Sequence, residues 1–177
     1  MSTSRFVIDH IRLTTTKPFD HVRADFERQL GRFDADAYRS LAAGENAETV
    51  SARIEAMAGP GGFMAFATHD HGALLRIVGL TRKAVQYVVG NPLYAVQMTQ
   101  HAIGASLYAL LRVLLYENDE GQVCVEYDRP SSLFGQFGDD RVAQVASSLD
   151  HKLEDLAAWR CAEGSSPARG RTTVCGG

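Results

Sequence analysis

Apolar positions follow two different periods in the first third of the chain, and these periods predict one strand and two helices. Residues 5–15 fit a period of two, with Val7, Ile11 and Leu13 on one face, which is typical of a β-strand. Apolar residues then recur every three or four positions over residues 18–30, which indicates an amphipathic helix capped by Gly31. After a polar stretch, Asn46 suits the N-cap of a second helix, and the glycine- and proline-rich run 59–62 ends it.

The middle of the chain predicts strands alternating with short helices. Residues 63–68 predict a buried strand. Asp70 suits the N-cap of a short helix that Gly79 closes, and we prefer this helix to a hairpin arm because strict alternation is absent. Residues 85–89 predict the next strand, and the pattern over residues 93–102 is helical.

The C-terminal half predicts a hairpin followed by one long helix. Residues 111–117 and 122–128 predict two strands, and the polar, glycine-containing stretch between them has hairpin chemistry. A long amphipathic helix starts at Asp139 or Asp140, and Trp159 near its end suits a docking residue.

Together these elements predict an α+β domain with one antiparallel sheet and helices packed on one face. Residues 1–160 form this single domain, and residues 161–177, rich in Gly, Ser, Pro and Arg, predict a flexible C-terminal tail. If the other face of the sheet is apolar, something must cover it. A homodimer is the simplest cover, so we expect a homodimer.

Composition narrows the class of protein. The chain has 177 residues, 45% of them hydrophobic, and a formal net charge of −3, so it can bury a core and lacks the basic surface of a nucleic-acid binder. Its apolar runs are too short to span a bilayer, and we expect no membrane partner. Its start has no signal-peptide pattern, and Cys124, Cys161 and Cys175 suit free thiols, so we expect a cytoplasmic protein.

The segment from Tyr87 to Pro92 is the most informative motif. A strand ends at Gly90, Asn91 follows, and a proline opens a helix. Backbone N–H groups at such a helix start bind anions and carbonyl oxygens, and the surrounding residues 71–116 contain basic but no acidic side chains. We therefore predict Tyr87, Gly90 and Asn91 as ligand-binding residues. The alternative is a structural joint in which Asn91 only caps the helix.

The histidines allow two kinds of chemistry. His71 beside Asp70 suits an acid or base tuned near neutral pH, with Asp70 orienting the ring. On a strand, His69 and His71 would face the same way, which is a spacing that metal ligands use, and His101 and Asp128 could complete the set. A hydrogen-bonded or solvated histidine pair is the simpler interpretation, so we assign no metal site.

Arg112 is the candidate for neutralising negative charge. On a hairpin it could form a cross-strand ion pair with Glu126 or Asp128. Alternatively it holds a ligand carboxylate or phosphate bidentately, with a tyrosine hydroxyl such as that of Tyr108 orienting the ligand.

These same residues fall into motifs that together resemble the family catalogued as domain of unknown function 302. The motifs are Asp70-His71, Tyr87 with Gly90-Asn91-Pro92, residues 108–117, Gly121 and residues 127–132. The likeness spans residues 63–156, and Ala109 stands where many members have proline. The resemblance implies a β-α-β4-α domain of the TATA-binding-protein-like class that forms homodimers. It also implies that Asp70, His71 and Asn91 share a pocket, and it carries no reaction across.

Three functional hypotheses follow. The first is a small-molecule-binding homodimer with a pocket near Asn91, whose ligand carries an anionic or carbonyl oxygen. The second is a cofactor-independent isomerase, lyase or hydratase, with His71 as base and Tyr87 or Tyr108 as acid. The third is a metal- or haem-binding protein that uses the histidines. The sequence identifies no cofactor.

Overall fold

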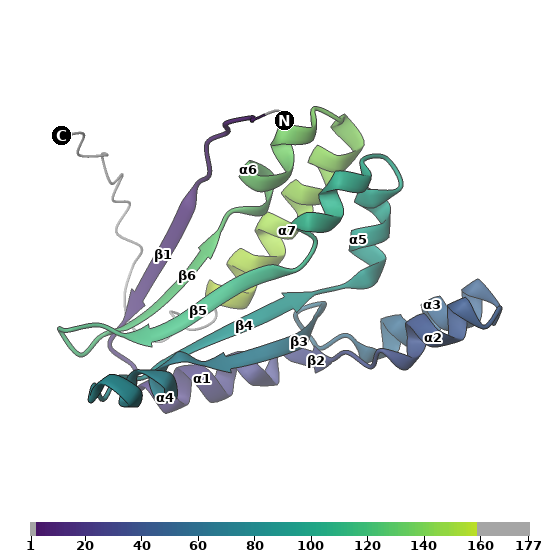
Figure 1. Ribbon diagram of the computed structural model, residues 1–177. Helices are drawn as coiled ribbons and strands as arrows, with labels where there is room; N and C mark the ends of the chain where they lie inside the picture. The colour runs from purple at the N-terminus through teal and green to yellow at the C-terminus, as the bar shows by residue number, and fades with distance from the viewer. Residues whose placement is uncertain (1–2, 159–177) are drawn as a thin grey trace.

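The computed structural model describes residues 3–158, which form one six-stranded sheet packed against helices (Figure 1). The strands are β1 (His10–Thr15), β2 (Leu30–Arg32), β3 (Phe63–Asp70), β4 (Ala84–Gly90), β5 (Leu111–Glu117) and β6 (Val123–Asp128). The helices are α1 (Phe19–Arg28), α2 (Asp36–Ala42), α3 (Ala47–Met57), α4 (His71–Leu75), α5 (Pro92–Thr99), α6 (Pro130–Phe134) and α7 (Asp140–Ala158). Short 3-10 turns are η1 (Arg76–Val78), η2 (Ile103–Leu107) and η3 (Gly135–Phe137).

The strand order is β1-β6-β5-β4-β3-β2, and every pair is antiparallel except β2 with β3. The predicted α+β class, the antiparallel sheet and the helix-covered face are confirmed. Within the predicted β-α-β4-α plan, β1, α1, the four strands β3–β6 and α7 occupy the expected places. The first strand is shorter than expected, because it begins at His10 and not at Arg5.

The sequence pattern did not predict β2, which begins inside the stretch that continues the periodicity of α1. Hydrogen bonding to β3 draws Leu30 into the sheet, opposite Phe63. This strand depends on glycine, because a Cβ atom at Gly31 would overlap the carbonyl oxygen of Met57. Helix α2 lies in the polar stretch after β2 and was also not predicted.

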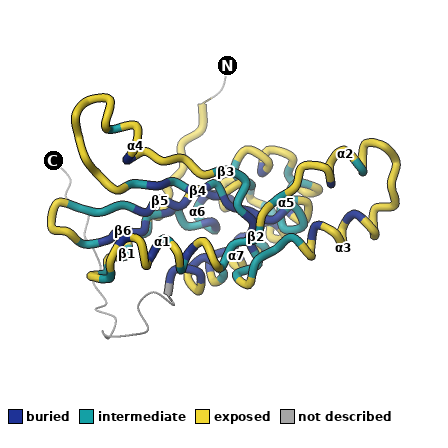
Figure 2. The backbone as a smooth tube through the Cα atoms, turned by 90° about the horizontal axis from the view of Figure 1, so that it is seen from below, coloured by how far each residue is buried: buried dark blue, intermediate teal, exposed yellow. Residues whose placement is uncertain are grey.

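Helices cover one face of the sheet and leave most of the other open. Helices α1, α5, α6 and α7 contribute to a core that also contains the inward-facing residues of β4, β5 and β6. Figure 2 shows α1 and α7 on one side of the strands and the short helix α4 on the opposite side. Asp70 caps α4 by accepting a hydrogen bond from the Ala73 N–H at 2.8 Å, and Gly79 ends the following turn with φ 77°, as predicted.

The open face of the sheet combines charged and apolar side chains, so it differs from the apolar face from which the homodimer was expected. Side chains of five strands form a row across it at one register level, in the order His69, Gln86, Leu114, Glu126 and Arg12. On one side of this row, Val88 is paired with Arg112 and His10 with Asp128. Half-buried apolar side chains such as Ala84, Val88 and Leu114 lie between these charges, and the homodimer stays a prediction.

In residues 3–158, no helix combines the length and the apolar character needed to cross a membrane. The predicted tail 161–177, Trp159 and the cysteines Cys161 and Cys175 lie outside the described residues, whereas Cys124 is buried and free, as expected from its strand position.

We predict that Gly31→Ala destabilises the protein by about 3 kcal/mol, because the added methyl group meets backbone atoms that cannot move independently. Chemical denaturation measures the change. Gly135→Ala is the matched control, since a Cβ atom there meets nothing within 4 Å and the residue has φ −58°. It should alter the free energy of unfolding by less than about 1 kcal/mol. Equal effects of the two substitutions would contradict the role given to Gly31.

Candidate functional site

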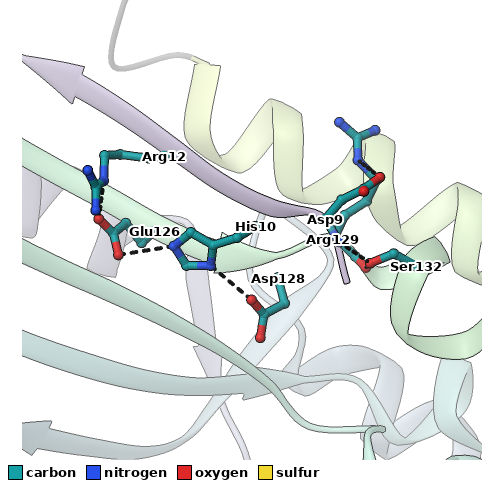
Figure 3. Close-up of polar contacts among 7 residues, drawn as sticks. All are labelled: Asp9, His10, Arg12, Glu126, Asp128, Arg129 and Ser132. Atoms are coloured by element: carbon teal, nitrogen blue, oxygen red, sulfur yellow. Dashed lines mark hydrogen bonds and ion pairs between the residues drawn. The ribbon is translucent and has the colours of Figure 1, made fainter. Parts of the chain in front are cut away.

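A network of polar side chains on the open face centres on Glu126 (Figure 3). The hydroxyl of Tyr116 donates a hydrogen bond to Oε1 of Glu126 at 2.7 Å, and the guanidinium of Arg12 pairs with the same oxygen. Nε2 of His10 lies 3.1 Å from the other carboxylate oxygen, Oε2. The side chain of Glu126 is 12% exposed, so its charge is held mainly by these three groups and much less by water.

His10 links two acidic side chains that lie two positions apart on β6. Its Nδ1 is 2.9 Å from Oδ1 of Asp128, while Nε2 contacts Glu126. A carboxylate can only accept, so both ring nitrogens can donate at once when the ring is a protonated imidazolium. The pKa of His10 is raised, mainly by the hydrogen bond to Asp128. Partial burial lowers this pKa, and the hydrogen bond to Glu126 raises it further.

The same contacts set the ionisation of Glu126 and Tyr116. Partial burial opposes the charge of Glu126, but hydrogen bonds from Tyr116, Arg12 and His10 outweigh it and lower the pKa of this carboxyl group. The pKa of Tyr116 is raised, first because its hydroxyl donates to Glu126 and second because of burial. Tyr116 is therefore a protonated donor to Glu126 at neutral pH, and its oxygen can still accept a hydrogen bond.

Two cavities lie on the open face, one at each side of this network. The larger, called here the Tyr116 cavity, has about 700 Å³ and includes Gln86, Leu114, Tyr116 and Glu126 in its lining. The smaller, called the Arg112 cavity, has about 410 Å³. Its lining residues are Val88, Leu107, Tyr108, Leu110, Leu111, Arg112, Asp128 and Leu133. Glu126 belongs to the first cavity and Asp128 to the second, so His10 joins an acid of each.

The Arg112 cavity brings together two residues that the sequence analysis singled out, Arg112 and Tyr108. Within residues 3–158, Arg112 forms no ion pair. The predicted cross-strand pair with Glu126 or Asp128 is not formed, because His10 and Arg12 on β1 occupy those acids. The ring of Tyr108 is fixed by edge contacts to Phe134 at 6.5 Å and Phe137 at 6.2 Å between ring centroids.

The structure separates the predicted cluster of Asp70, His71 and Asn91. Asp70 pairs with Val85 at one end of the β3–β4 hairpin, whereas Asn91 follows Gly90 at the other end. The three residues therefore do not share a pocket. The carboxylate of Asp70 caps α4, so it is engaged with backbone and does not orient the ring of His71 by any hydrogen bond among the described residues.

Asn91 acts as a structural joint. It is 7% exposed, its Oδ1 accepts a hydrogen bond from the Leu93 N–H at 2.9 Å, and its Nδ2 donates to the Gly62 carbonyl at 3.0 Å. The first bond caps α5 and the second ties the helix start to the loop before β3. Because both ends of the amide are engaged, the structure favours the role of a structural joint over a ligand-binding role for Asn91.

Tyr87 and Gly90 also have structural surroundings. Tyr87 is 1% exposed, its hydroxyl donates to Glu27 at 2.7 Å, and its ring packs on Phe26, so it faces the helix-covered side. Burial is the main cause that raises the pKa of Tyr87. Gly90 lets the chain around Leu110 pass close, because a Cβ atom there would lie 2.9 Å from a methyl carbon of Leu110. Neither residue lines one of the two cavities.

The histidines proposed as metal ligands do not converge. The rings of His69 and His71 are 6.5 Å apart between centroids, and His71 lines the Tyr116 cavity. His101 follows α5, beyond the opposite end of β4. No group of three or more His, Cys, Asp or Glu side chains with a metal-binding arrangement occurs in the part of the chain that the structure describes.

These features define a class of protein: a single α+β domain with an open, polar sheet face that carries two cavities joined by a charged network. The family model described as "Domain of unknown function DUF302" matches residues 39–158, and the chain belongs to this family. The matched stretch contains Tyr116, Glu126 and Asp128, whereas His10 and Arg12 precede it. The strand that completes the network is therefore outside the matched region.

A solved structure supports the fold. The crystal structure of an uncharacterized conserved DUF302 protein from Bacillus stearothermophilus is similar, with a TM-score of 0.56 and 15% sequence identity. The comparison covers 84% of this chain and 93% of the other. At this identity the likeness concerns the fold alone. No curated protein matches this chain.

We predict that Asn91→Ala lowers the free energy of unfolding by about 1–3 kcal/mol, because it removes a cap and leaves the Gly62 carbonyl without its donor. Denaturation curves provide the measurement. Asn46→Ala, which removes an exposed cap with bonds to Glu48 and Thr49, is the comparison and should cost less, about 1 kcal/mol. A stability loss at Asn91 no larger than at Asn46 would argue against the joint.

The His10 bridge predicts a pH-dependent stability. Because folding raises the pKa of His10 above its ordinary value of 6.5, its contribution is complete below pH 6.5 and is lost as the pH rises through the raised value. The difference in unfolding midpoint between the wild type and His10→Asn should therefore shrink as the pH rises above 6.5. His21→Asn is the control, since this exposed histidine forms no ion pair with the described residues. A difference for His10→Asn that is constant with pH would contradict the bridge.

Proposed function

We propose that the protein binds a small molecule that carries a carboxylate, and that Arg112 holds this group in the Arg112 cavity. The observation that carries the proposal is a guanidinium without an ion pair, among the described residues, at the wall of a cavity of about 410 Å³. Cavities of roughly 300–1,000 Å³ are the usual size for small ligands. Guanidinium groups match carboxylates because two parallel N–H donors fit the two oxygens.

The remaining lining supports a carboxylate on a compact apolar body. Tyr108 stands in the same lining, and its hydroxyl forms no hydrogen bond with residues 3–158, so it is available as a second donor. Val88, Leu111 and Leu133 supply apolar walls. Asp128 also faces this cavity, but its charge is offset by His10. The pairing of Asp128 with His10 thus leaves the positive charge of Arg112 uncompensated and favours an anion.

The Arg112 cavity does not include the helix start at Asn91, where the pocket was predicted from the sequence and where the amide is already engaged. It keeps two of the residues predicted from the sequence, Arg112 and Tyr108, and the chemistry predicted for the ligand. The alternative of an acid–base enzyme receives less support, because Asp70 caps a helix and does not orient His71. The homodimer stays a prediction, and native mass spectrometry reports it together with any retained small molecule.

Benzoate is a suitable probe of the Arg112 cavity because it combines one carboxylate with one flat apolar ring. We predict that benzoate shifts the NMR signals of Arg112, Tyr108 and their neighbours, and that Arg112→Gln weakens the binding at least about tenfold, since a charge-assisted bidentate contact contributes about 1.5–3 kcal/mol. The unfolding midpoint should change little, because Arg112 is exposed and makes no ion pair among the described residues.

Arg76→Gln is the matched control, since Arg76 is also exposed and without an ion pair in the described part of the chain, but lies outside both cavities. It should leave the affinity for benzoate unchanged. Binding of benzoate that survives Arg112→Gln, or that is lost equally in Arg76→Gln, would overturn the assignment of Arg112.

A further inference from the structure

The larger Tyr116 cavity differs from the Arg112 cavity in its charge balance. The charged side chains that line it are already paired with one another or with neighbours. Arg82 pairs with Asp119, and Nζ of Lys83 lies 3.7 Å from Oε2 of Glu117. The carboxylate of Glu126 is satisfied by three donors from outside the cavity or at its wall. Apart from His71, every acidic and basic side chain of the lining has a partner, so no strong charge is left over to select an anion or a cation.

Hydrogen-bonding groups without partners remain in this cavity. Gln86 is half-buried on β4, next to Leu114 of β5 in the row across the sheet. Its side-chain amide forms no hydrogen bond with any described residue. One amide provides a donor and an acceptor side by side, which matches the donor and acceptor of another amide. The oxygen of Tyr116, whose proton points to Glu126 and which also contacts the thiol of Cys124, keeps a second lone pair as an acceptor position.

Several side chains next to Gln86 are apolar, and most of them belong to the sheet. Leu114 and Ala84 are half-buried neighbours on β5 and β4, and Leu75 faces them from the end of α4. A pleated sheet presents such residues as a broad floor, and a flat ring covers more of that floor than a branched chain does. The volume of about 700 Å³ has room for more than one ring.

We propose that the Tyr116 cavity is a second binding site, which takes an uncharged, planar ligand with an amide-like edge read by Gln86. The ring lies on Leu114 and Ala84, and the donor of its edge reaches the acceptor of Gln86 or the oxygen of Tyr116. This site does not depend on Arg112. The two cavities therefore select ligands of similar shape and different charge: a carboxylate in one and a neutral amide in the other.

Benzamide and benzoate form a matched pair of probes for this difference, because they share the ring and differ in charge. We expect benzamide to shift the NMR signals of the Gln86 side-chain amide and the Leu114 methyl groups, with an affinity in the millimolar range that suits a fragment. Gln86→Met keeps the length of the side chain and removes the amide, so it should weaken benzamide binding about tenfold. Benzoate binding should be unchanged by Gln86→Met.

Two further variants complete the test. Gln144→Met, on the exposed side of α7, is the matched control and should leave benzamide binding unchanged. Leu114→Phe keeps an apolar residue on the strand but fills the floor of the cavity, so it should also block benzamide. Unfolding midpoints of each variant, measured alongside, separate a lost site from a lost fold.

The crossed design distinguishes this inference from the proposed function. Benzamide binding that is lost in Gln86→Met and kept in Arg112→Gln supports the second site, whatever benzoate does. Benzamide that produces no shifts at saturating concentration, shifts the Arg112 cavity instead, or survives both Gln86→Met and Leu114→Phe would overturn it. Failure of benzoate alone would overturn the carboxylate site and leave the Tyr116 cavity as assigned.

Discussion

The pairing of β1 with β6 is the contact on which the candidate site depends. It joins the first strand of the chain to the last one in sequence. The pairing sets His10 opposite Asp128 and Arg12 opposite Glu126. A shift of one residue would turn both basic side chains toward the core. Since Glu126 is only 12% exposed and takes its donors from this face, the register of β1 and the charges of β6 support each other.

This contact also decides which cation is free. On the hairpin alone, Arg112 of β5 would be the natural partner of an acid on β6. When β1 is in place, His10 and Arg12 occupy those acids, and Arg112 is left at the wall of a cavity. The pairing of this edge strand with β6 therefore leaves Arg112 available as a binding group. The same pairing offsets the negative charge of Glu126, which suits the neighbouring Tyr116 cavity to an uncharged ligand.

The family match covers only part of the charged network around Glu126. The DUF302 match begins at residue 39, after β1, α1 and β2, so the acids of the site lie inside it and their basic partners lie before it. The cavities and the acidic side chains belong to the matched domain. Their charge balance depends on β1, a strand outside that stretch.

Local chemistry was enough to predict much of the fold. The Asp70 cap, the β5–β6 hairpin and the long helix α7 depend on neighbours a few positions apart, which a single sequence displays directly. Arg112 and Tyr108 were also recognisable as candidates, since a basic and an aromatic residue stood close together in a stretch without acids. The sequence thus identified these two candidate residues and the helix start at Asn91.

Tertiary structure decided which of these groups are available. The sequence motif predicts a ligand-binding role for Asn91, but in the fold its amide donates to the Gly62 carbonyl and is no longer available. Strand β2 was not predicted, because its partner β3 lies some thirty positions away in the sequence and the helical periodicity of α1 continues into β2. His10 and Glu126 are separated by 116 positions, so no local pattern links them. Sequence determines what each side chain can do, whereas contacts across such distances decide which partners it meets and what remains free for a ligand.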